Sequence, residues 1–171
     1  PIVAEAVKIL AIKDVYQKNK IKRNYEAFID GVGQPDSEKL YEKLSNGSGI
    51  DEECAEVIFD TIVTSIKPLK AKILGQLIVG LANGKLNVSE YKTLAYIIHS
   101  CSIPALLALE KYYQNNNSSV KNMSARLENE GLLISLGVAT RQVNKFRIDE
   151  LGEKLAKYGM KSEYNKKINK D

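Results

Sequence analysis

The chain has 171 residues, of which 44% are hydrophobic and 27% are charged, and its formal net charge is +4 at pH 7. This composition is too apolar for a disordered protein, and the length suits one domain or a helical domain with a small module attached. The mild positive charge permits an acidic partner without requiring one, and no apolar run reaches the ~20 residues that span a bilayer.

The first segment, residues 2–29, contains neither proline nor glycine and is predicted to be helical. Its opening stretch is apolar, and Val3, Val7 and Leu10 form a stripe at helical spacing. Five basic residues follow: Lys13, Lys18, Lys20, Lys22 and Arg23. We interpret them as a solvated face; the alternative is a basic flank that faces nucleic acid or anionic lipid. Because the chain opens at Pro1, we expect either a removed initiator methionine or an upstream segment, for which a membrane anchor is one alternative.

Two helices are predicted in the middle of the chain, and the first of them is amphipathic. The first covers residues 51–66, and its inner face carries apolar and small residues at helical spacing: Cys54, Val57, Ile58, Thr61, Ile62 and Ser65. The second covers residues 69–82 and is apolar on most sides, which is typical of a central buried helix. It contains Gly75 and Gly80, which each cost about 1 kcal/mol relative to alanine inside a helix. We therefore expect these glycines to let a neighbouring helix come close.

Two further helices have recognisable start signals. Asn87 and Glu90 have the spacing of a capping box, with asparagine as the N-cap. Ser102 is expected to cap the next helix, because Pro104 then falls in the first turn, where its missing N–H costs little. The sequence therefore predicts five or six helices before the polar loop at residues 114–119.

Catalytic and metal-binding motifs are not found in the sequence. His99 is the only histidine, and no cysteine–histidine cluster has metal-ligand spacing. The two cysteines, Cys54 and Cys101, do not make a secreted disulfide framework, so we expect buried thiols in a reducing, cytoplasmic compartment. We predict that the protein is not an enzyme, and we expect no cofactor, no metal and no small-molecule substrate.

Residues 118–159 are the one part of the sequence that suggests an activity. We expect a helix over residues 120–130, ended by Gly131, and then a first strand at residues 132–134. A basic turn leads to a second strand at residues 145–148, and a closing helix follows it.

That order resembles the second half of winged-helix regulators, in which a strand and wing follow the reading helix. The resemblance implies contacts with DNA through five basic residues: Lys121, Arg126, Arg141, Lys145 and Arg147. Two departures from the pattern stand against it, because Glu128 and Glu130 leave the reading helix near neutral and only a polar loop precedes it. The alternative is a helix–hairpin–helix cap that completes the core.

A wider resemblance covers residues 66–112, followed by the phrases RLENEGLL and KFRIDELG. This pattern resembles uncharacterised prophage-associated helical proteins and the abortive-infection (Abi-alpha) group. Those proteins combine a helical body with a winged-helix-like end. The resemblance implies a bacterial or phage origin and a context of defence or immunity, and it brings no catalytic residues.

We predict a mainly α fold: a helical bundle followed by a small winged-helix-like module made of a helix, a β-hairpin and a helix. The expected divisions are a bundle at residues 1–101, the module packed on it at 102–159, and a basic, frayed tail at 160–171. The first functional hypothesis is a non-catalytic interaction or regulatory protein of phage or host-defence type, with a protein partner or a second copy bound through the apolar first helix. The alternative is a winged-helix DNA-binding transcriptional regulator, whose partner is nucleic acid.

Overall fold

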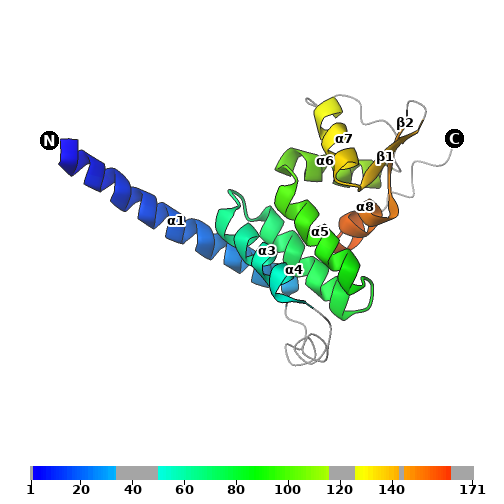
Figure 1. Ribbon diagram of the computed structural model, residues 1–171, viewed down its shortest axis with the longest axis horizontal. Coiled ribbons are helices and arrows are strands. Elements are labelled where there is room, and N and C mark those ends of the chain that lie inside the picture. The colour runs from blue at the N-terminus through cyan, green and yellow to red at the C-terminus, as the bar shows by residue number, and fades with distance from the viewer. Residues whose placement is uncertain (1, 34–49, 116–125, 143–144, 163–171) are drawn as a thin grey trace.

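The computed structural model describes residues 2–33, 50–115, 126–142 and 145–162. Within these ranges the fold is mainly α, as predicted: a helical bundle is followed by a short helix, a two-stranded antiparallel hairpin and a closing helix (Figure 1). The elements in chain order are α1 (Ile2–Val32), α3 (Glu52–Thr64), α4 (Leu69–Ala82), α5 (Val88–Ser100), α6 (Ile103–Gln114), α7 (Arg126–Ser135), β1 (Ala139–Gln142), β2 (Lys145–Ile148), α8 (Glu150–Lys154) and the π-helical turn η1 (Leu155–Gly159).

Helix α4 is central, as its sequence predicts, and α1 crosses it at two glycines. A Cβ atom on Gly75 would lie 2.2 Å from the carbonyl oxygen of Phe28, and one on Gly31 would lie 2.2 Å from the carbonyl oxygen of Lys72. Both distances are far below van der Waals contact, so the two backbones meet where neither helix carries a side chain. At Gly80 a Cβ would meet a methyl group of Leu86 at 3.3 Å, which is a looser contact.

The hydrophobic core is one continuous cluster that extends from α3 to η1. Leu74 and Leu77 of α4 are fully buried within it, and the C-terminal module contributes Leu133, Phe146 and Leu155. The module is therefore packed on the bundle through shared core residues. The division of the chain at residues 101 and 102 stays a prediction.

The predicted helix starts of α5 and α6 are confirmed. The Asn87 side chain accepts the backbone N–H of Glu90 at 2.9 Å, and Glu90 accepts the backbone N–H of Asn87 at 3.0 Å, which completes the capping box. Ser102 caps α6 by accepting the N–H of Ala105, with Pro104 in the first turn. Each cap satisfies backbone donors that the helix itself leaves without partners.

Glu90 also binds the last helical segment, and this contact gives the stability a defined pH dependence. Lys154 Nζ lies 2.5 Å from Glu90 Oε1. Lys154 first, and the Asn87 N–H second, lower the pKa of the Glu90 carboxyl below its ordinary value. The folded protein therefore keeps this group ionised at a pH where the unfolded chain protonates it. The stabilisation is fully present above about pH 4.3, the ordinary glutamate value, and is lost as the pH falls through the folded pKa.

We expect Glu90→Gln to flatten the pH dependence of the free energy of unfolding just below pH 4.3, because the variant has no proton to take up there. Urea denaturation at a series of pH values measures this. Glu56→Gln is the matched control, since Glu56 is exposed on α3 and forms no ion pair within the described part of the chain. Parallel pH curves for wild type and Glu90→Gln would contradict the expectation.

The predicted end of the reading helix at Gly131 and the strand at residues 132–134 are wrong. Helix α7 continues through Gly131 to Ser135 and ends in a Schellman motif at Gly137. The N–H of Gly137 donates to the carbonyl of Ile134, that of Val138 donates to the carbonyl of Leu133, and Gly137 has φ +73°. Leu133 and Val138 are both fully buried, so the motif also closes a hydrophobic contact. The first strand follows this turn.

Candidate interaction surfaces

Helix α1 extends beyond the body on which it packs (Figure 1). Its second half crosses α4, whereas its first half projects away from the rest of the molecule (Figure 1). In the projecting half Val15 is 60% exposed and Tyr16 is 57% exposed. At 1.5 Å per residue, the stretch from residue 2 to residue 16 extends for about 22 Å. The described part of the chain leaves this half of the helix without a packing partner.

Three polar side chains of α1 fix the direction in which the helix projects. Asn24 is fully buried, and its Nδ2 donates to the carbonyls of Ile62 and Ser65 at 2.8 and 2.7 Å. Arg23 Nη2 donates to the Ile66 carbonyl at 2.7 Å, and Lys20 Nζ lies 3.5 Å from the carbonyl of Thr64. These carbonyls are the open acceptors at the C-terminal end of α3, where a helix dipole also favours cations.

Sequence reasoning missed this anchoring role. Lys20 and Arg23 belong to the basic cluster that we interpreted as a solvated face, with nucleic acid or lipid as the alternative. Lys22 is solvated and lies 3.8 Å from Glu26 as an exposed pair. The signal that could have separated them is position, because residues 20, 23 and 24 fall on one side of a helix together with Ile21 and Phe28.

One face of α1 packs against the body with a regular spacing. Positions 17, 21, 24, 28 and 31 are buried or half-buried, whereas the neighbouring positions 18, 22 and 25 are exposed. Counted in the same steps of three and four residues, the series reaches the exposed Asp14 and then positions 10, 7 and 3. By sequence, Val3, Val7 and Leu10, which form the stripe, are therefore in line with the packing seam of α1.

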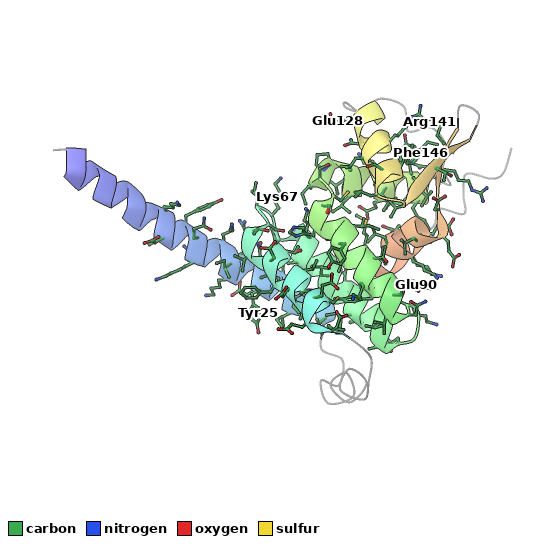
Figure 2. The ribbon with its side chains drawn as sticks, in the orientation of Figure 1. Tyr25, Lys67, Glu90, Glu128, Arg141 and Phe146 are labelled. Atoms are coloured by element: carbon green, nitrogen blue, oxygen red, sulfur yellow. The ribbon has the colours of Figure 1, made fainter. Side chains whose placement is uncertain are left out.

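The β-hairpin places its described basic residues on opposite faces. Arg141 pairs with Phe146 in the antiparallel register and shares a face with it, whereas Arg147 lies on the other face. Figure 2 labels Arg141 and Phe146 of this first face. There Arg141 Nη2 contacts Oε2 of Glu130 at 2.9 Å, and Glu130 is only 2% exposed. The hydroxyl of Tyr112 donates to the same carboxylate, and the Tyr112 and Phe146 rings pack with centroids 4.4 Å apart. Arg141 is thus held by an internal ion pair.

Arg147 lies beside carboxylates on the outer face of the hairpin. A shallow hollow of about 240 Å³ is lined there by Thr140, Arg147, Ile148, Asp149, Glu150 and Glu153. Three acidic side chains around one arginine disfavour a nucleic-acid phosphate at this position. Lys121 lies outside the described residues, as do the side chains of Arg126 and Lys145, whose backbones are at the start of α7 and of β2. DNA contact through these five residues stays a prediction.

Cys54 and Cys101 are free and buried, as predicted. Among the described residues, no group of three or more histidine, cysteine, aspartate or glutamate side chains could hold a metal ion. The helices in those same ranges include none with the length and apolarity needed to cross a membrane.

Comparison with known proteins adds no assignment to this geometry. No family model matches the chain, no curated protein matches it, and no solved structure matches it. The most distinctive of the surfaces described above is the projecting half of α1.

Proposed function

We propose that this protein is a non-catalytic interaction protein that docks through the projecting half of α1, and that its partner there is a second copy of the chain. The observation that carries the proposal is the packing seam of α1, with which Val3, Val7 and Leu10 are in line by sequence. A helix of this length that is isolated in water is only marginally stable, and packing of an apolar face supplies most helical stability in proteins. The projecting half therefore needs an occupant on that face.

Self-complementarity of the seam favours a second copy as the occupant. An antiparallel pairing of two α1 helices, centred between Val7 and Leu10, brings Val7 of one copy opposite Leu10 of the other. The same apolar pair then forms twice, once on each side of the centre. The bodies of the two copies then lie at opposite ends of the helix pair and do not collide.

The resemblance to prophage-associated and abortive-infection proteins supports a role in phage biology or host defence. In that setting a paired helical protein acts as a regulator or an adaptor and not as a catalyst. The proposal of a phage or defence context depends on the resemblance alone, whereas the proposal of pairing depends on α1.

Light scattering across a concentration series, from micromolar to near-millimolar, tests the pairing. We expect wild type to reach twice the mass of one chain, and we expect Leu10→Lys to remain a monomer because a cation on the seam opposes helix pairing. Val15→Lys is the matched control: it places the same side chain on α1 at an exposed position off the seam, and the variant should still pair.

Two results would contradict the proposal. One is a wild-type chain that stays monomeric throughout the series. The other is a dimer that Leu10→Lys leaves intact, which would place the interface elsewhere. If the monomeric wild type instead co-sedimented with anionic lipid vesicles, the occupant of α1 would be a membrane surface and the second copy would be ruled out.

A further inference from the structure

A pocket of about 260 Å³ lies where the end of α3, the start of α4, the end of α5 and the start of α6 meet. Its wall includes Ile66, Lys67, Lys70, His99, Cys101 and Ile103. Figure 2 shows Lys67 in the turn between α3 and α4. The volume is slightly below the ~300 Å³ at which pockets for drug-sized ligands begin, so the pocket suits one small group.

Lys70 gives the pocket its main charge. Its Nζ donates to the carbonyl of His99 at 2.7 Å, and within the described residues this is its one hydrogen bond and it has no carboxylate partner. An ammonium has three N–H donors, so two remain for a ligand. The side chain is half-buried, and burial lowers the pKa of Lys70. A partly desolvated cation without a counter-ion is unfavourable, and a bound anion removes that penalty.

A second lysine adds to the same preference. Lys67 supplies a second positive charge, and no carboxylate is among the residues that line the pocket. The carboxylate of Asp60 contacts the lining residue His99: its Oδ2 lies 3.5 Å from His99 Nε2, while His99 Nδ1 hydrogen-bonds Thr61 Oγ1 at 3.0 Å. The helix dipoles largely cancel, because the N-terminal ends of α4 and α6 and the C-terminal ends of α3 and α5 all lie at the pocket. The preference for an anion therefore comes from the two lysines.

Much of the remaining wall is apolar. Ile66 is 74% exposed at the rim, and Ile103 is half-buried beside it. Burial raises the pKa of Cys101 to about 11, so its thiol is neutral and acts as part of the apolar lining. A ligand that only carries charge would leave this part of the wall unused.

We infer that the pocket binds a carboxylate that is carried on a short apolar group, with Lys70 as the main contact of the carboxylate and Ile66 and Ile103 against the apolar group. Two sources have this chemistry: a free short-chain carboxylic acid, and the last residue of a partner protein, whose main-chain carboxylate follows an apolar side chain. This site is separate from α1 pairing and does not depend on it.

Backbone amide NMR of the whole chain tests the inference with four probes. Isovalerate represents the free acid, N-acetyl-leucine represents a chain end, N-acetyl-leucine amide lacks the carboxylate, and inorganic phosphate lacks the apolar group. We expect the first two to shift the amides of the pocket residues saturably, and the last two to bind at least about tenfold more weakly, a loss of about 1.4 kcal/mol. Tighter binding of N-acetyl-leucine than of isovalerate supports a chain end, and the reverse order supports a free acid.

Lys70→Met is expected to weaken the binding of isovalerate and of N-acetyl-leucine by at least about tenfold. The dispersion of the amide spectrum of this variant reports whether it folds. Lys67→Glu alters only an exposed side chain at the pocket, and it should weaken the binding of both acids several-fold. This variant tests the inference even if Lys70→Met does not fold. Lys85→Met removes an exposed lysine outside the pocket and should bind as wild type does. The inference is overturned by any of three results: no saturable shift with either acid, equal binding of the amide or of phosphate, or unchanged binding by Lys67→Glu.

Discussion

Replacing Gly75 with alanine is expected to destabilise the protein by about 3 kcal/mol, although alanine is the better helix former by about 1 kcal/mol. The added Cβ would lie 2.2 Å from the carbonyl oxygen of Phe28 and 2.9 Å from the backbone nitrogen of Val32. Both neighbours are backbone atoms of α1, which cannot rotate away as a side chain can. The two helices must therefore separate, and the contacts along their crossing are lost together.

Gly131→Ala is the matched control for this prediction. Gly131 lies inside α7, and a Cβ there would meet no atom within 4 Å. The same substitution should therefore stabilise the protein, by roughly 0.5–1 kcal/mol. Urea denaturation of both variants measures the two changes. A Gly75→Ala variant as stable as wild type would show that α1 and α4 do not cross at the glycines.

The second large effect is expected at Glu130. We expect Glu130→Ala to lower the free energy of unfolding by about 3 kcal/mol, because it removes the acceptor of two hydrogen bonds and leaves a cavity in the core. Tyr112 is 1% exposed and would lose this partner for its hydroxyl, and Arg141 would lose its ion pair. Glu128→Ala, an exposed glutamate on the same helix, should change stability by no more than about 0.5 kcal/mol.

Thermal or urea unfolding of the Glu130→Ala and Glu128→Ala variants measures both changes in the free energy of unfolding. If both variants had the same small effect, Glu130 would not be part of the core. The result also bears on the DNA hypothesis, because an Arg141 variant that fails to bind DNA would first have to be shown to keep its fold. Arg147 lies on the opposite face of the hairpin, away from Glu130, so replacing it tests DNA binding without breaking the Arg141–Glu130 ion pair.

Much of the bundle could be predicted from the sequence because its signals are local. The capping box of Asn87 and Glu90, the Ser102 cap and the bounds of α4 depend on neighbours within four residues, and the structure confirms each of them. The close approach at Gly75 was also expected, since an unfavourable residue inside a buried helix needs a packing reason. The partner in that approach, Gly31, is not visible in the sequence, because it lies just beyond the predicted helix at residues 2–29.

The predictions for the end of the reading helix and for the basic side chains failed for the same reason, which is that similar local signals compete. Gly131 and Gly137 both fit a helix C-terminus, and only burial of Leu133 and Val138 selects the second. Basic side chains fit a solvated face, a nucleic-acid contact or a helix cap equally well in sequence. Arg23 binds the carbonyl of Ile66, and Arg141 binds the carboxylate of Glu130. Both partners belong to other elements of the fold, so the spacing of the basic residues in the sequence could not identify these contacts.

The anchoring of α1 also joins the docking helix to the pocket. The Ile66 carbonyl accepts from Arg23 of α1, while Ile66 itself forms part of the pocket wall. Arg23 lies between the projecting half of α1 and the glycine crossing at Gly31, so the helix is fixed to the pocket wall on the side that projects. One side chain thus serves both surfaces: it sets the direction of the docking helix and binds a carbonyl of the pocket wall.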